Sequence, residues 1–242
     1  MFKKILSILF ISIGLYNSDA FFAPSVKLAS GKKVNLIGNG PPLLFSTGLF
    51  GTMPRSFYND FVNILKKNYT VITTEGLNRV DENTIDELCE ALNVDKISYL
   101  SHSSFLSEVL NTDKINSAVL MDPINIPWIS FQGLTNSIIK LNFPTLIIKA
   151  EKLYTGSKTL PEWQDPEFKG DYNEEVIDNV GHPDILDNTW ANIAKNIGLW
   201  EMANGEKMNY SNWQYNMRSE LPNLRKKYRK NIAHKVISFI NQ

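Results

Sequence analysis

The residues best suited to chemistry in this sequence are a serine and a histidine that each follow a predicted strand. Ser103 lies in the stretch 101–105, SHSSF, directly after the apolar run 97–100. A serine on a sharp turn between a strand and a helix presents its hydroxyl above the sheet edge, as in the G-x-S-x-G pattern. Ser101 stands at the first glycine position and Phe105 at the second. The stretch predicts a nucleophile at Ser103 or, alternatively, a polar turn with a helix-capping serine.

A serine nucleophile needs a base, and the base needs a carboxylate to orient it. Of the three histidines, His182 follows a predicted strand and Gly181, whereas His234 falls among basic residues of a C-terminal helix pattern. The glycine gives the backbone freedom to aim the imidazole. Asp122 and Glu151 each follow a predicted strand. From the residues alone, either carboxylate can hold the histidine, and either can instead cap a turn.

An oxyanion formed during acyl transfer needs backbone N–H donors. The loop 46–52 follows an apolar run and carries two glycines, which permit a backbone that points amides inward. We expect the N–H groups of Leu49 and Ser104 to be the donors. The alternative is an ordinary strand–helix loop with glycine turns.

The segments around these residues alternate between strand and helix patterns. Two short strands around Gly31 predict a hairpin, and amphipathic spacing predicts helices over 56–67, over 81–92 with Asp81 as its cap, and from Phe105 to Leu110. Apolar runs predict buried strands at 41–45, 69–73, 97–100, 117–121, 145–148 and 175–177. The pattern predicts an α/β fold: one domain over 26–242 with a mostly parallel sheet and helices on both faces.

Two segments lie between or beyond these elements. Residues 152–174 are rich in proline and glycine and predict a loop-rich insertion. A group of apolar residues predicts either a small lid over an apolar pocket or core packing: Trp128, Phe131, Leu134, Ile138 and Ile139. A C-terminal helix shows one apolar face at steps of four: Leu224, Tyr228, Ile232, Val236 and Ile240. Its basic run 225–230 is expected on or beside the solvated face, with peripheral membrane association as the alternative.

The N-terminus has the pattern of a targeting segment. Lys3 and Lys4 precede the apolar run 5–15, so residues 1–20 predict a signal peptide, with an uncleaved anchor as the alternative. The following residues, Ala20-Phe21-Phe22-Ala23-Pro24, resemble the cleavage signature of bipartite plastid presequences. We therefore expect delivery to a plastid, and secretion or an endomembrane lumen is the alternative.

Composition excludes several classes of function. The 25 basic and 25 acidic residues balance, so there is no general electrostatic reason to bind nucleic acid. The single cysteine, Cys89, allows no intramolecular disulfide. Phosphate-cradling glycine loops and metal-ligand motifs are absent from the sequence, so we expect no cofactor and no metal.

The order of these motifs resembles the α/β-hydrolase superfamily, and within it the chlorophyllase and lipase-like branch. Residues 45–49 resemble that branch's strand ending in His-Gly, with Thr47 in place of the histidine, and residues 101–104 resemble its Gly-His-Ser elbow. Met121-Asp122-Pro123 resembles its Asp-Pro motif, which favours Asp122 over Glu151 as the triad acid.

The resemblance implies a serine ester hydrolase acting on a small apolar ester, such as a lipid or a chlorophyll-type ester. An acyltransferase would use the same residues, with an alcohol in place of water. Phe105, at a position that is normally glycine, motivates a different alternative. In that case the fold is a catalytically weak or inactive protein that binds an apolar ligand or a partner.

Overall fold

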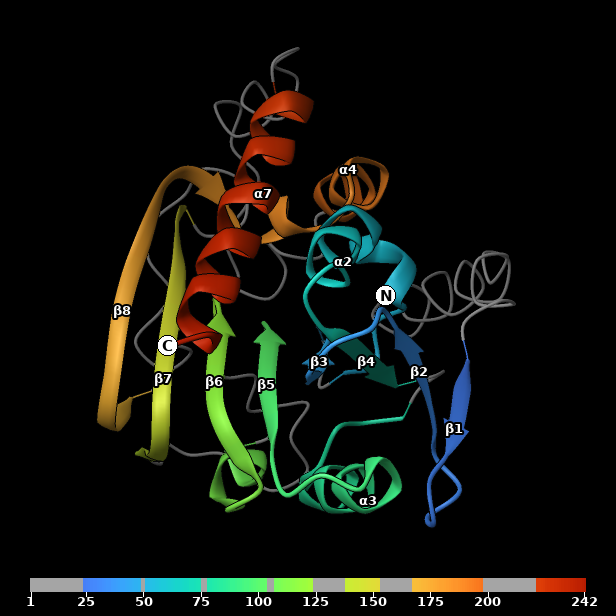
Figure 1. Ribbon diagram of the computed structural model, residues 1–242. Coiled ribbons are helices and arrows are strands. Elements are labelled where there is room, and N and C mark those ends of the chain that lie inside the picture. The colour runs from blue at the N-terminus through green and yellow to red at the C-terminus, as the bar shows by residue number, and fades with distance from the viewer. Residues whose placement is uncertain are drawn as a thin grey trace.

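The computed structural model describes residues 24–48, 51–74, 78–103, 107–123, 138–152, 167–197 and 221–242. Its frame is an eight-stranded sheet in the order β1-β2-β4-β3-β5-β6-β7-β8 (Figure 1). The strands are β1 (Ser25–Lys27), β2 (Lys33–Ile37), β3 (Pro42–Ser46), β4 (Thr70–Thr74), β5 (Ile97–His102), β6 (Ile115–Met121), β7 (Ile139–Lys152) and β8 (Phe168–Gly181).

The sheet is antiparallel at one end and parallel through the rest. β1 pairs with β2 and β2 with β4 in antiparallel register, and every pair from β4 to β8 is parallel. The predicted hairpin and the predicted mostly parallel sheet are both confirmed. Since parallel strands end at one edge, the residues that follow β3, β5, β6 and β8 meet at that edge.

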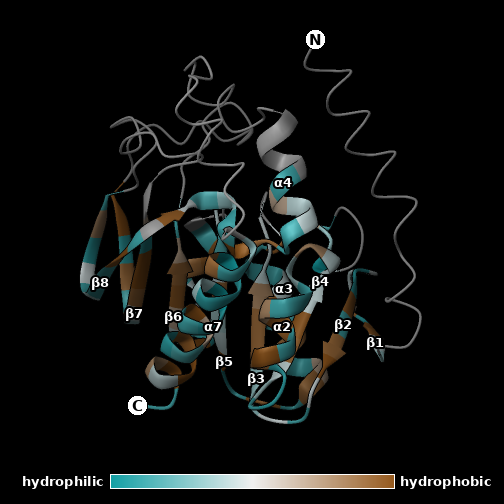
Figure 2. Cartoon of the chain, turned by 90° about the horizontal axis from the view of Figure 1, so that it is seen from above, coloured by the Kyte–Doolittle hydropathy of each residue, from teal (hydrophilic) through white to brown (hydrophobic). Residues whose placement is uncertain are grey.

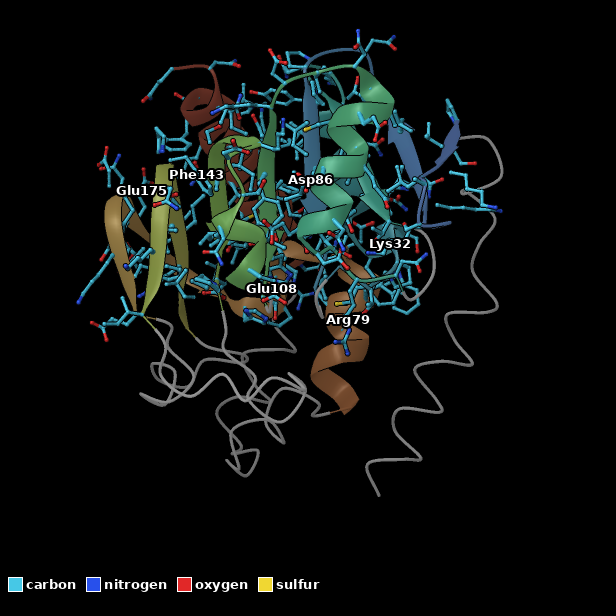
Figure 3. The ribbon with its side chains drawn as sticks, turned by 90° about the horizontal axis from the view of Figure 1, so that it is seen from below. Lys32, Arg79, Asp86, Glu108, Phe143 and Glu175 are labelled. Atoms are coloured by element: carbon cyan, nitrogen blue, oxygen red, sulfur yellow. The ribbon has the colours of Figure 1, made fainter. Side chains whose placement is uncertain are left out.

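Helices cover both faces of the sheet, as expected. One face carries η2 (Arg55–Tyr58), α2 (Asn59–Leu65), α4 (Asn188–Ile197) and α7 (Leu221–Ile240), and the other carries α3 (Glu82–Leu92) and η3 (Ser107–Asn111). Each face has its own apolar cluster. Figure 2 shows apolar strands in the centre and helices with mixed polar and apolar surfaces outside them. In Figure 3, α3, marked by Asp86, lies on the opposite side of the sheet from α7.

Local chemistry explains the α3 helix. The Asp81 carboxylate accepts the Thr84 N–H at 2.9 Å, and the Thr84 hydroxyl accepts the Asp81 N–H, which completes a capping box. The helix ends at Asn93 in a left-handed conformation, φ 52°. The predicted helix over 81–92 and its cap are confirmed.

Several predicted bounds were wrong. The helix predicted over 56–67 divides into η2 and α2. In place of the helix predicted from Phe105 to Leu110, the described residues form the short 3-10 helix η3. Residues 168–174, assigned to the insertion, belong to β8, and β7 begins at Ile139. β8 is an edge strand with mostly exposed residues, so charged side chains are tolerated there and hide the apolar pattern. Glu175 marks this edge in Figure 3.

The largest correction concerns the basic run of α7. Tyr228, Ile232 and Val236 are buried, as the apolar spacing predicted, but Leu224 is 41% exposed. Arg225 and Arg229 are each only 1% exposed, and they lie on the protein side of the helix rather than on its solvated face. Both are held by carboxylate partners, the condition that lets a buried cation persist.

Other expectations fall on residues that the structure does not describe. They include the predicted signal peptide (1–20), residues 153–166 of the predicted insertion, Phe105 of the predicted turn, and the lid residues Trp128, Phe131 and Leu134. Of the remaining lid residues, Ile138 is 40% exposed, and Ile139 is partly buried and packs against the apolar cluster on the α3 face. Among the described residues, no helix combines the length and the apolar character that crossing a membrane requires.

Candidate active site

Ser103 lies one residue beyond β5, where the chain leaves the sheet. Its N–H still continues the parallel ladder by donating to the Met121 carbonyl at 3.0 Å. Its φ of 66° is a left-handed value, which is strained for a residue other than glycine. The strand therefore ends in a sharp turn at Ser103. The side chain is buried, with 1% of the residue exposed.

Asp122 occupies the equivalent place after the neighbouring strand β6. Its N–H donates to the Ile148 carbonyl at 2.6 Å, and its φ is 49°. Its carboxylate has two separate partners: Oδ1 accepts the Ala150 N–H at 2.9 Å, and Oδ2 lies 2.8 Å from Nδ1 of His182. The two bonds fix the orientation of the carboxylate between β7 and the end of β8.

His182 opens η4 (His182–Ile185) directly after the last residue of β8. A carboxylate only accepts hydrogen bonds, so the Nδ1 atom that faces Asp122 carries a proton. In neutral His182, Nε2 is then the nitrogen that can take up a proton. His182 can thus accept a proton at Nε2, and the Asp122 carboxylate lies beside the imidazolium that results.

A buried ion pair stabilises the turn that carries His182. Asp184 accepts the Gly181 N–H through Oδ2 at 2.8 Å and the Arg225 Nε–H through Oδ1 at 2.8 Å. Arg225 also donates to the Asn192 side chain at 2.8 Å. Asp184 is fully buried, with an exposed fraction of 0%. Together with Arg225 it links α7, α4 and the end of β8 around the imidazole of His182.

A second carboxylate near this turn has an altered acidity. Asp187 accepts the N–H groups of Asn59 and Asp60 at 3.0 Å each, and so caps the start of α2 from across the fold. Burial is the main cause that raises its pKa to about 6, and the neighbouring carboxylate of Asp60 adds to the effect.

A third set of contacts surrounds His102, the residue before Ser103. Tyr58 Oη lies 2.8 Å from His102 Nδ1 and receives the Gly48 N–H at 3.0 Å. The other ring nitrogen, Nε2, lies 3.2 Å from the carbonyl oxygen of His182. The rings of His102 and His182 stack, with centroids 4.7 Å apart and planes at 25°.

Burial keeps this set of side chains uncharged. Desolvation, and secondarily the neighbouring His182, lowers the pKa of His102 well below its usual value. Burial likewise raises the pKa of Tyr58 far above its usual value, so its hydroxyl keeps its proton. Sequence reasoning placed His102 in the turn but gave it no role, and it missed Tyr58, because no local pattern signals a contact across 44 residues.

The structure brings three of the expected site residues to one edge of the sheet: Ser103, Asp122 and His182. Leu49 and Ser104, the expected oxyanion donors, lie outside the described residues. Glu151 belongs to β7 by its backbone, and its side chain is not described. Of the two expected acids, Asp122 is the one shown in contact with His182, at 2.8 Å. Within the same described ranges, no group of three or more His, Cys, Asp or Glu side chains could hold a metal ion.

Comparison with known proteins yields likeness of fold only. No protein-family model matches the chain, and no curated protein matches it significantly. Among solved structures, a meta-cleavage product hydrolase from Pseudomonas fluorescens IP01 is 14% identical, covering 75% of this chain and 96% of its own, with a TM-score of 0.46. An esterase from Rhodococcus sp. ECU1013 is 12% identical (72% and 98% covered, TM-score 0.47), and a hydrolase from Pseudomonas aeruginosa PA01 is 13% identical (76% and 97%, TM-score 0.46).

Proposed function

We propose that this chain is a serine ester hydrolase in which Ser103, His182 and Asp122 form the catalytic triad. One observation carries the proposal. A serine with a left-handed φ of 66° ends a central strand beside a buried Asp122–His182 pair joined at 2.8 Å. Strain of this kind in a residue other than glycine is typical of functional turns, and an aspartate–histidine pair is the means by which such a serine is activated.

The reaction would proceed through an acyl-enzyme. Ser103 Oγ attacks the ester carbonyl carbon while its proton passes to His182 Nε2. Asp122 stabilises the imidazolium that forms, through the 2.8 Å contact at Nδ1. The same proton then passes to the alcohol oxygen as the ester bond breaks. Water then attacks the acyl carbon and gives a proton to His182 Nε2. That proton returns to Ser103 Oγ as the bond between the acyl group and Ser103 breaks and the carboxylic acid leaves. We propose the N–H groups of Leu49 and Ser104 as the donors that bind the oxyanion.

The substrate class is the finer part of the proposal. An uncharged apolar ester is proposed because apolar residues, among them Trp128 and Phe131, lie in the sequence between Asp122 and the next strand, where a lid over an apolar pocket is expected. A lipid or a chlorophyll-type ester is proposed on the sequence resemblance alone, which is analogy at the level of family.

Steady-state hydrolysis by the purified protein tests the proposal. The panel consists of p-nitrophenyl esters with acyl chains of increasing length, together with chlorophyll. We expect hydrolysis by the wild type and a loss of about 10³-fold or more in kcat for Ser103→Ala. The matched control is Ser117→Ala. Ser117 is a buried serine of β6, and its register partner Ser98 lies at the opposite end of β5 from Ser103. Equal activity of wild type and Ser103→Ala would contradict the proposal.

A second candidate function has its own supporting observation. Ser103 is 1% exposed, and its hydroxyl has no hydrogen-bond partner among the described residues. A serine held in that way suits a protein that retains the fold to bind an apolar ligand. If the wild type hydrolyses no ester in the panel, co-purified apolar ligands identified by mass spectrometry would support this candidate.

Delivery to a plastid remains part of the proposal. It rests on the order of a basic start, an apolar run and the Phe21-containing sequence before Pro24. A fluorescent reporter carrying residues 1–40 should enter the plastid of an alga with complex plastids. Phe21→Ala should leave the reporter outside the plastid stroma, whereas secretion of both reporters would favour the lumenal alternative.

A further inference from the structure

We infer that His102 is a positioning residue, which fixes the backbone and the ring of His182 to the loop after β3 through Tyr58 and Gly48. The inference rests on the proposed function, because it assigns His102 a part in holding the proposed base. His102 does not itself touch the reacting atoms. Its two ring nitrogens are both engaged, one by Tyr58 and one by the His182 carbonyl.

The direction of each hydrogen bond follows from the chemistry of its ends. The Gly48 N–H can only donate, so Tyr58 Oη accepts it at 3.0 Å. The His182 carbonyl can only accept, so the proton of neutral His102 lies on Nε2, 3.2 Å away. His102 Nδ1 is then an acceptor, and the Tyr58 hydroxyl donates to it at 2.8 Å. The result is a directed chain from Gly48 to Tyr58, to His102 and to His182.

Packing holds the chain from both sides. The Tyr58 ring meets His102 edge-on, with centroids 5.6 Å apart and planes at 74°. The ring of His182 stacks against the ring of His102. Tyr58, His102 and His182 are each at most 1% exposed, so water does not compete for these bonds. The His182 imidazole is therefore fixed by three contacts: Asp122 at Nδ1, the bond from His102 to its carbonyl, and the stacked ring.

The chain also joins parts of the site that are distant in sequence. Gly48 immediately precedes Leu49, a proposed oxyanion donor, and His102 immediately precedes Ser103. A side chain at Gly48 would displace its neighbours, because an added Cβ would lie 2.5 Å from Met53 Sδ and 3.1 Å from Tyr58 Oη. One buried hydrogen-bond chain thus joins three parts of the proposed site: the turn that carries Ser103, the base His182, and the loop after β3 that holds Gly48. A displacement at one end is transmitted to the others, and small displacements of reacting groups cost rate steeply.

Three variants separate the contributions of this chain. His102→Phe keeps a ring beside His182 but removes both hydrogen bonds, and Tyr58→Phe removes only the hydroxyl. His102→Gln keeps an N–H donor within reach of the His182 carbonyl. We expect kcat to fall about 10- to 100-fold in His102→Phe and about tenfold in Tyr58→Phe, with KM within about twofold. His102→Gln should recover most of the loss in kcat. Tyr58→Phe keeps the test open if His102→Phe does not fold.

A second readout is independent of activity. The chain has only three histidines, so ring-nitrogen NMR of protein labelled with ¹⁵N-histidine can be assigned by substituting each in turn. We expect His102 to show the Nε2–H tautomer in the wild type. Tyr58→Phe should alter the ring signals of both His102 and His182. The control is His234→Gln on the exposed side of α7, which should leave both sets of signals unchanged.

The outcomes distinguish the inference from the proposed function. If the wild type hydrolyses esters and both His102→Phe and Tyr58→Phe keep kcat within twofold, the inference is wrong and the function stands. If the wild type hydrolyses no ester, the proposed function fails and the NMR readout decides alone. In that case, altered His182 signals in Tyr58→Phe support the positioning role, and unaltered signals overturn it.

Discussion

Replacing Arg225 by methionine should destabilise the protein strongly, although the residue lies in a run of basic residues on a C-terminal helix. Methionine keeps most of the length of the side chain and removes the guanidinium. Asp184 would then lose the Arg225 guanidinium that lies 2.8 Å from its carboxylate. Its charge would stay buried, because the exposed fraction of Asp184 is 0%. Removing one partner of a buried ion pair costs about 3–5 kcal/mol. Against a typical domain stability of about 5–15 kcal/mol, this is a large share.

Urea unfolding followed by the fluorescence of the five tryptophans measures this loss. The matched control is Lys226→Met, one residue further along α7 and exposed, which should change stability by at most about 0.5 kcal/mol. The double variant Arg225→Met/Asp184→Asn should recover much of the loss, because an amide oxygen can still accept the Gly181 N–H without a buried charge. A loss below about 1 kcal/mol in Arg225→Met, in a protein with native circular dichroism, would refute the reasoning.

Three further predictions concern Asp122, Asp187 and Gly51. Asp122→Asn should lower kcat by about 10⁴-fold in steady-state assays, because an amide favours the wrong tautomer of His182; an unchanged kcat would exclude Asp122 as the acid. The pKa of Asp187 rises from 3.8 unfolded to about 6 folded, so its stabilising contribution is present at low pH and is lost as pH rises through 6. In urea unfolding, Asp187→Asn should therefore lose less stability than wild type between pH 5 and 7.5, and equal losses would contradict this. Gly51→Ala should lower the melting temperature, because φ is +87° and the new Cβ would lie 2.8 Å from a Val80 methyl group; an unchanged value would show that the loop adjusts.

The sequence was informative about the candidate site wherever its residues lie at the ends of parallel strands. Ser103, Asp122 and His182 each follow a strand that the apolar pattern predicted, and parallel pairing brings those ends together without further information. The helix over 81–92 was predictable because its cap and its apolar stripe are both local.

The sequence was uninformative wherever a residue's partner lies far along the chain. Arg225 resembles its exposed neighbours in type, and only the position of Asp184, 41 residues away, explains its burial. Tyr58 and His102 are 44 residues apart and share no motif. The length of β8 was underestimated because an exposed edge strand carries charged residues, which hide the alternation of apolar and polar residues that marks a strand.

The central claim is that Ser103 is an activated nucleophile, and labelling with a fluorophosphonate probe tests it most directly. The probe should form one covalent adduct on the wild-type protein, located at Ser103 by peptide mass spectrometry. Labelling should be lost in Ser103→Ala, fall strongly in His182→Ala, and persist in the control Ser117→Ala. No adduct on the wild type under conditions that label a known serine hydrolase, or an adduct that survives in Ser103→Ala, would contradict the account.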